Sequence, residues 1–144
     1  MAKIIFCGDR NWADRGWIIQ VMSTLKENLK KFVVIEGEAK GADAMSCGVA
    51  VNILELPIKR FPANWNEYGR AAGPIRNRQM LDEGKADAVV AFHLNLAESR
   101  GTADMVAAAR KRGLPVWVCT DGSDALAEFI IRVRRLVKDG VNAQ

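Results

Sequence analysis

The chain has 144 residues, enough for one globular domain with a buried core, and we expect a single domain over residues 1–144. Hydrophobic residues make up 49% and charged residues 26%, a balance that excludes an intrinsically disordered chain. No apolar run approaches the roughly 20 residues of a membrane-spanning helix, and the net charge of +4 is spread along the chain.

The N-terminal apolar run and the cysteines indicate a cytoplasmic protein. The run stops at Gly8, too early for a secretory signal, so it is interpreted as a first strand. Cys7, Cys47 and Cys119 each lie in an apolar stretch, which is typical of reduced thiols in a core. Because the only histidine is His93, we expect no metal site, and we expect no cofactor.

Five short apolar runs alternate with helical patterns. This order predicts an α/β Rossmann-like fold with a mostly parallel five-stranded sheet and helices on both faces. The predicted strands are Lys3–Cys7, Phe32–Glu36, Leu56–Phe61, Ala88–His93 and Pro115–Cys119. Four of them are almost continuously apolar, as strands covered on both faces are, whereas the third is polar enough to lie nearer an edge.

Helical patterns fill the intervals between the strands. An amphipathic stripe runs from Ile18 to Leu29, and a helix of small residues is predicted from Asp43 to Leu54. Pro74 marks a helix start and Gly84 its end, and a further helix covers Thr102 to Arg112.

The last helix has one apolar and one basic face. The apolar face consists of Leu126, Phe129, Ile130, Val133, Leu136 and Val137, with Gly140 expected to follow the helix. The basic face holds Arg132, Arg134, Arg135 and Lys138. A solvated surface is the simpler interpretation of these charges, and a nucleic-acid patch is the alternative.

Polar segments follow the first four strands at one edge of the predicted sheet. In a parallel sheet, ligands bind outside the carboxyl ends of the strands. The segments are 8–12, 37–43, 61–73 leading into 76–78, and 98–104. Segment 61–73 is longer than most βα connections, so we expect an ordered, functional loop there.

Two of these segments have the features of a phosphate site. Gly101 and Thr102 open a helix, and a helix N-terminus offers unpaired N–H groups and a positive dipole end to an anion. Ser99 and Thr102 add hydroxyl donors. Segment 37–43 repeats the pattern at another helix, although each segment alone also fits a structural turn or cap.

Charged and aromatic residues at the same edge favour a nucleotide over a plain anion. Arginine suits phosphate and carboxylates suit ribose hydroxyls, although two or three of these residues are expected to form ion pairs between the loops. The charged residues are Arg10, Arg70, Arg76, Arg78, Arg100, Asp9, Glu38, Asp43, Glu67 and Asp104. Trp12, Trp65 and Tyr68 are candidates for stacking on a base, with burial in the core as the alternative for Trp12.

Five segments resemble the SLOG superfamily, and within it the small YspA-like branch: CGDRNW, GEAKGAD, FPANWNEYGRAAGPIRNRQM, ADAVVAF and SRGTADM. The resemblance implies a Rossmann-like fold that binds nucleotides or related ligands at its strand-end loops. With the motifs, it predicts ligand contacts at Gly8, Asp9, Arg10, Trp12, Gly37, Gly41, Ala42, Asp43, Trp65, Tyr68, Arg76, Asn77, Ser99, Arg100, Gly101 and Thr102.

Better-known members of the superfamily include the "lonely guy" phosphoribohydrolases, in which an arginine of an R-K-x-x-M segment and a glutamate of a G-G-x-G-T-x-x-E segment carry the reaction. Arg76 looks like that arginine, with Asn77 in place of the lysine. Asp104 lies one residue before the position of the glutamate, which is Met105 here. The resemblance therefore implies Arg76 and Asp104 as candidate catalytic residues, and Glu38 is a further candidate carboxylate for stabilising the sugar and orienting a water.

Three functions remain open at this stage. The first is a sensor-like or non-catalytic protein that binds a nucleotide or nucleotide-derived small molecule. The second is an N-glycoside or phosphoribo-hydrolase, and the third is a nucleic-acid-binding protein. We expect no membrane partner, and because relatives often form dimers, we expect a homodimer.

Overall fold

The computed structural model describes the backbone of residues 1–142 and the side chains of residues 1–138. Its centre is a sheet of five parallel strands in the order β3-β2-β1-β4-β5. The strands are β1 (Ala2–Gly8), β2 (Phe32–Glu36), β3 (Ile58–Arg60), β4 (Ala88–Phe92) and β5 (Val116–Val118). All five predicted strands are present, and the predicted α/β fold is confirmed.

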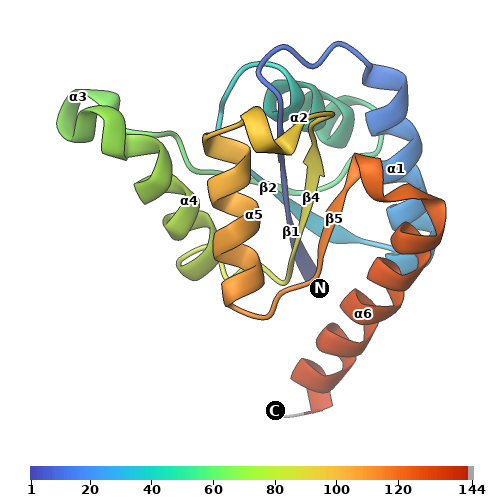
Figure 1. Ribbon diagram of the computed structural model, residues 1–144. Coiled ribbons are helices and arrows are strands. Elements are labelled where there is room, and N and C mark those ends of the chain that lie inside the picture. Colours follow the sequence, from blue (N-terminus) through green and yellow to red (C-terminus); the bar gives the residue numbers. More distant parts are fainter. Residues whose placement is uncertain (143–144) are drawn as a thin grey trace.

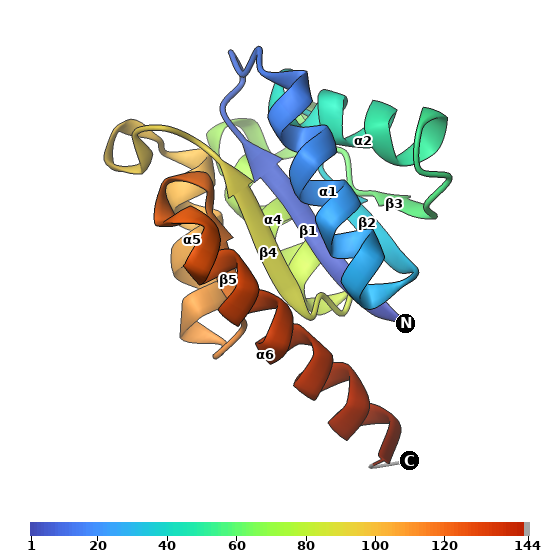
Figure 2. The ribbon, with the colours of Figure 1, turned by 90° about the vertical axis from the view of Figure 1, so that its right-hand side faces the viewer.

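Helices cover both faces of this sheet, as Figures 1 and 2 show. The helices α1 (Arg15–Leu29), α2 (Ala42–Asn52) and α6 (Gly122–Asn142) pack on one face. The helices α4 (Ala72–Asp82) and α5 (Gly101–Lys111) pack on the other. Because neither face of the sheet meets water, its central strands are apolar without alternation.

The two sides of β1 illustrate how the core is divided. Ile4 and Phe6 enter the core under α1, α2 and α6, whereas Ile5 and Cys7 enter the core under α4 and α5. All four side chains are buried, since successive strand residues point to opposite faces and each face is covered. Strand β3, which was predicted near an edge, is one of the two edge strands and is only three residues long.

Segment 61–73, predicted to be a long ordered loop, is largely helical. It contains the short helix α3 (Trp65–Tyr68) and a turn of 3₁₀ helix (Gly69–Ala71), and its last residues already belong to α4. Asn64 begins α3 by accepting a hydrogen bond from the Glu67 N–H. Helix α3 projects from the side of the molecule (Figure 1).

Helix α6 differs from the prediction in two respects. It continues past Gly140 to Asn142, so the glycine does not end it. Leu136, expected on the buried face, is 41% exposed, whereas Phe129 and Val133 are buried. The outer part of α6 extends beyond the sheet (Figure 2), so it has less protein to pack against.

Trp12 is part of the core, which corrects its prediction as a ligand contact. Its ring packs against Trp17 and Phe92, with centroids 5.7 and 5.5 Å away, and its Nε1–H donates to the carbonyl of Asp14. Only 7% of the residue is exposed, so it offers no face to a base. Cys7 and Cys119 are buried as expected, and Cys47 is half-buried.

Helix α6 is long enough to span a bilayer but is too rich in charged residues, and within residues 1–142 no helix is both long and apolar enough to do so.

Candidate functional site

The loops after β1, β2 and β4 meet at the carboxyl ends of the strands, which we call the carboxyl edge. The Asp9 N–H donates to the carbonyl of Phe92 at the end of β4 (2.8 Å), and the Asp9 carbonyl accepts from the Ala42 N–H at the start of α2 (3.1 Å). Gly41 has a positive φ of 71°, and a Cβ there would overlap the backbone of Asp9 and Arg10. The first two loops are therefore locked together by close backbone packing.

In the β2–α2 loop, the buried carboxylate of Asp43 interacts with backbone N–H groups of the same loop. Asp43 accepts a hydrogen bond from the Gly37 N–H (3.2 Å), and its carboxylate also faces the Ala39 N–H. Burial raises the pKa of Asp43, and the nearby Arg76 guanidinium and the two N–H donors oppose that rise. The Gly37 N–H, one of the donors that this loop could offer to a phosphate, is thus already bonded to the protein's own carboxylate.

Arg76 on α4 reaches across to the end of β2. Its Nη1–H donates to the Gly37 carbonyl (2.7 Å) and its Nε–H to the Asn77 side-chain oxygen (3.2 Å). A Cβ on Gly37 would overlap the Arg76 side chain, so a larger residue there would displace the guanidinium from this position. Among the described side chains, no carboxylate lies within 4 Å of the Arg76 nitrogens. This cation is fixed in place without an ion-pair partner in that part of the chain.

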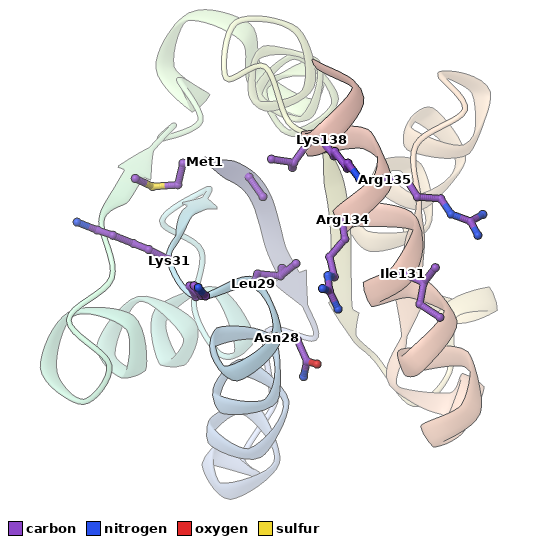
Figure 3. A pocket seen from close by; sticks show the side chains of 11 residues that line it. Met1, Asn28, Leu29, Lys31, Ile131, Arg134, Arg135 and Lys138 are labelled. Carbon is purple, nitrogen blue, oxygen red and sulfur yellow. The ribbon is translucent and has the colours of Figure 1, made fainter. Parts of the chain in front are cut away.

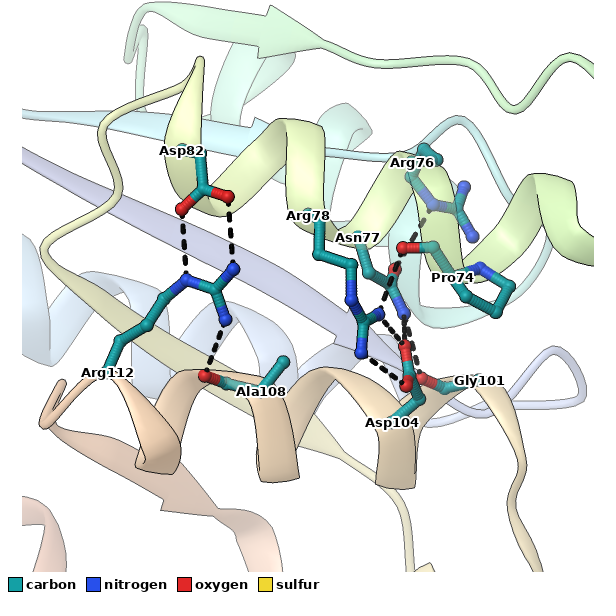
Figure 4. A network of polar contacts seen from close by, with 9 residues as sticks. All are labelled: Pro74, Arg76, Asn77, Arg78, Asp82, Gly101, Asp104, Ala108 and Arg112. Carbon is teal, nitrogen blue, oxygen red and sulfur yellow. Dashed lines mark hydrogen bonds and ion pairs between the residues drawn. The ribbon is translucent and has the colours of Figure 1, made fainter.

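Asn77 connects Arg76 to the start of α5 (Figure 4). The residue is 3% exposed, and its Nδ2 donates to the Gly101 carbonyl (3.2 Å) and to Asp104 (2.9 Å). One buried amide therefore links two of the predicted binding segments, which lie 24 residues apart in the sequence.

Asp104, a predicted catalytic carboxylate, is held by two partners on α4. Arg78 binds both of its oxygens, at 2.7 and 3.1 Å, and Asn77 donates to one of them. Burial alone would raise the pKa of Asp104, but these hydrogen bonds outweigh burial and the pKa lies below its usual value. A second ion pair, between Arg112 and Asp82 at 2.9 Å, joins the same two helices further along (Figure 4).

The N-terminus of α5 is the open part of the carboxyl edge. Ser99 accepts a hydrogen bond from the Thr102 N–H (3.0 Å) through its side-chain oxygen and thereby caps the helix. Thr102 is buried, which leaves Arg100 and Gly101 exposed at the helix start. Within the described residues, the N–H groups of Gly101 and Ala103 have no hydrogen-bond acceptor. Free N–H groups and a positive dipole end at a helix start favour an anion.

Glu36 is a buried carboxylate at this edge that the sequence analysis placed only as the end of a strand. It is 1% exposed and accepts a hydrogen bond from the Glu38 N–H (2.6 Å). Its other oxygen has no hydrogen bond among the described residues, although Arg60 Nε lies 3.3 Å away. Burial is the main cause that raises the pKa of Glu36. In the sequence, the signal for this buried carboxylate was the acidic residue at the end of the apolar run FVVIE.

The remaining predicted contacts are dispersed. Glu38 is exposed, has a φ of 57°, and lies 3.9 Å from Arg60. Arg10 is exposed beside Asp9, whose carboxylate accepts a hydrogen bond from a nearby backbone N–H. Trp65 and Tyr68 are 59% and 42% exposed on the projecting helix α3, and their contact with a ligand stays a prediction.

Over the described residues, no three His, Cys, Asp or Glu side chains are grouped in a way that could hold a metal ion.

The strand order and the strand-end site define a Rossmann-like α/β protein. The sequence profile of the YspA, cpYpsA-related SLOG family matches residues 2–68. The Gene 61 protein of Mycobacterium phage D29 is 31% identical over 121 residues, which cover 81% of this chain and 94% of that protein. The chain belongs to the YspA, cpYpsA-related SLOG family, as the resemblance in the sequence implied.

Solved structures of DNA processing protein A (DprA) share the fold. The proteins from Streptococcus pneumoniae and Helicobacter pylori each superpose with a TM-score of 0.60 at 17% identity over 96% of this chain. The match spans 56% of the Streptococcus chain and 81% of the Helicobacter chain. This chain is thus similar to little more than half of the Streptococcus protein.

Proposed function

We propose that the carboxyl edge binds a nucleotide or a nucleotide-derived small molecule, with a phosphate at the start of α5. The observation that carries the proposal is the linked set of Arg76, Asn77 and Gly101. The Asn77 side chain binds both the Arg76 guanidinium and the Gly101 carbonyl at the N-terminus of α5, and Arg76 also binds the Gly37 carbonyl. Among the described side chains, Arg76 has no ion-pair partner within 4 Å. The guanidinium and the helix N-terminus both stabilise an anion, and arginine can hold phosphate oxygens in a bidentate manner.

The edge also offers groups for the rest of a nucleotide. Glu38 is an exposed carboxylate that can accept hydrogen bonds from ribose hydroxyls. Trp65 and Tyr68 have exposed rings, and such rings stack on bases in many binding proteins. We assign no chemical step to the site, so the protein acts as a binding or sensing protein in this proposal.

Thermal unfolding in the presence of AMP, ADP, GMP, NAD and ADP-ribose tests this function. A ligand at a hundredfold its dissociation constant adds about 2.7 kcal/mol to the free energy of unfolding, or about 5–10 °C at this chain length. We expect one class of nucleotide to produce that shift. No shift with any of them at millimolar concentration would overturn the proposal.

Two arginine variants locate the site. Arg76→Gln removes the fixed cation and should weaken nucleotide binding about tenfold, since a charge-assisted hydrogen bond contributes about 1.5–3 kcal/mol. Arg110→Gln, on the exposed last turn of α5, removes the same charge and should leave binding unchanged. Equal weakening by both variants would show that net charge, rather than this site, holds the ligand.

Single-stranded nucleic acid is a second candidate ligand. The structure of the Helicobacter DprA, which shares this fold, is described as showing single-stranded DNA binding by that protein. The net charge of +4 is compatible with such a partner. Binding to a poly-dT oligonucleotide would weaken steeply with salt, because each neutralised phosphate releases counterions, whereas binding of a mononucleotide would depend on salt much less.

Hydrolysis of an N-glycosidic bond is not part of the proposal. Asp104 is bound by both Arg78 and Asn77, so its carboxylate is engaged in holding α4 and α5 together. Met105, at the position of the hydrolase glutamate, is buried and apolar.

A further inference from the structure

A hollow of about 600 Å³ lies at the amino end of the sheet, away from the carboxyl edge. It is formed by the start of β1, the end of α1 and the outer half of α6 (Figure 3). We call it the basic hollow, and its lining consists of Met1, Ala2, residues 28–31, Ile131, Arg134, Arg135, Val137 and Lys138.

Part of the lining of the basic hollow consists of apolar side chains that are exposed to solvent. Met1 is 58% exposed and Ile131 is 49% exposed, and both belong to the lining. Leu29 and Val137 are partly buried beside them. Exposed apolar groups gathered in a concave surface indicate a place where another molecule binds.

The rim of the hollow is strongly positive. Lys30, Lys31, Arg134, Arg135 and Lys138 all line it and are all exposed, and no acidic side chain among residues 1–138 belongs to the lining. None of the ion pairs among residues 1–138 involves these five side chains. Figure 3 shows Arg134 pointing into the hollow, whereas Lys31 and Arg135 point away from it on opposite sides.

A second hollow, of about 570 Å³, continues the first between α1 and α6. The two share Asn28, Ile131 and Arg134 in their linings. Trp117 lies at the bottom of the second hollow but is only 3% exposed. Together the hollows follow the groove between two helices, which is the shape that receives a helix in helix-in-groove recognition.

We propose that this groove binds an acidic amphipathic helix of a partner protein. Such a helix places apolar side chains in the hollows and its carboxylates against the five rim cations. A second copy of this chain would bring the same cations face to face across a symmetric contact. Single-stranded nucleic acid binds through exposed aromatic rings on which its bases stack, whereas the aromatic residues of the described lining are the partly buried Trp17 and the buried Trp117.

Fluorescence anisotropy with synthetic peptides tests this inference. The probe is a labelled amphipathic helix with leucine on one face and glutamate on the other. A scrambled peptide of the same composition, a leucine–lysine amphipathic helix and a labelled dT oligonucleotide are the comparisons. We expect only the acidic amphipathic helix to bind, with the double variant R134E/K138E weakening it about tenfold or more through charge repulsion.

Two variants separate the groove from general charge. R132E reverses an exposed arginine on the same helix that lines neither hollow, and it should change the affinity by less than about threefold. I131D adds a charge to the apolar lining and should abolish binding, while circular dichroism checks that the fold is kept. Equal binding of the scrambled peptide, tighter binding of the oligonucleotide, equal loss in R132E, or no binding of the acidic helix would overturn the proposal.

Discussion

The β2–α2 loop and the β4–α5 loop both place a glycine before a helix at the carboxyl edge, but only the second leaves its donors free. In the first, Asp43 accepts a hydrogen bond from the Gly37 N–H, and its carboxylate also faces the Ala39 N–H. In the second, Ser99 caps one N–H while Gly101 stays exposed. A glycine-rich turn before a helix therefore indicates an anion site only when no side chain of the protein already fills it.

The largest expected effect is a loss of stability on replacing Gly41 of the β2–α2 loop, which the same replacement of Gly101 in the β4–α5 loop should not produce. Gly41→Ala should lower the free energy of unfolding by about 2 kcal/mol or more, because the new Cβ overlaps the backbone of Asp9 at a positive φ. Gly101→Ala should change stability by less than about 1 kcal/mol, since a Cβ there meets no atom within 4 Å. Urea unfolding measures both, and equal losses would mean that the loops do not differ in this way.

Removal of the carboxylate that fills the β2–α2 loop should have the next largest effect. Asp43→Ala leaves the Gly37 N–H without its acceptor and should lower the free energy of unfolding by about 1–3 kcal/mol. Asp43→Asn keeps an acceptor oxygen and should lose less. An alanine variant as stable as the parent protein would show that the Asp43 carboxylate does not stabilise this loop through hydrogen bonding.

A pH effect is expected from Glu36, whose pKa burial raises. A carboxyl group with a raised pKa in the folded state stabilises the fold below its unfolded pKa of about 4, and this contribution is lost as pH rises through the folded pKa. The Glu36→Gln variant should therefore gain stability relative to the parent protein between pH 4 and pH 7.

Urea unfolding at several pH values measures that difference. Glu55→Gln, at an exposed position, is the control and should show no such trend. A difference between Glu36→Gln and the parent protein that shrinks towards pH 7 would contradict the burial of an ionised Glu36.

The smallest effect is expected at the contact between α4 and α5. Asp104→Asn removes the ion pair with Arg78, which is partly exposed, and should lower the free energy of unfolding by less than about 1 kcal/mol. Nucleotide binding should persist, because Asp104 is not a ligand contact in our proposal. Loss of binding in a folded Asp104→Asn variant would give this carboxylate a role in the site.

The fold could be predicted from the sequence because burial on both faces makes four strands almost continuously apolar, while the polar third run marks an edge. The end of α6 could not, since a glycine weakens a helix without always ending it. The outer part of α6 extends beyond the sheet (Figure 2), and Leu136 is 41% exposed. Neither result can be derived from local pattern alone.

The candidate site was predictable in part. Gly37, Arg76, Asn77 and Gly101 were named from the sequence, and hydrogen bonds connect all four. That Asp104 is held by Arg78 depends on helices far apart in the sequence meeting side by side. Trp12 could not be assigned to core or ligand, because an aromatic residue in a strand-end loop has the same local pattern in both cases.

The central claim is that a nucleotide phosphate lies at the start of α5 and not in the β2–α2 loop. Titration of ¹⁵N-labelled protein with the best-stabilising nucleotide, followed by two-dimensional NMR, tests it most directly. We predict that the amide signals of Gly101, Thr102 and Ala103 shift most, with smaller changes at Gly37 and Ala39. Largest shifts in the β2–α2 loop, or shifts confined to residues outside the carboxyl edge, would contradict this account.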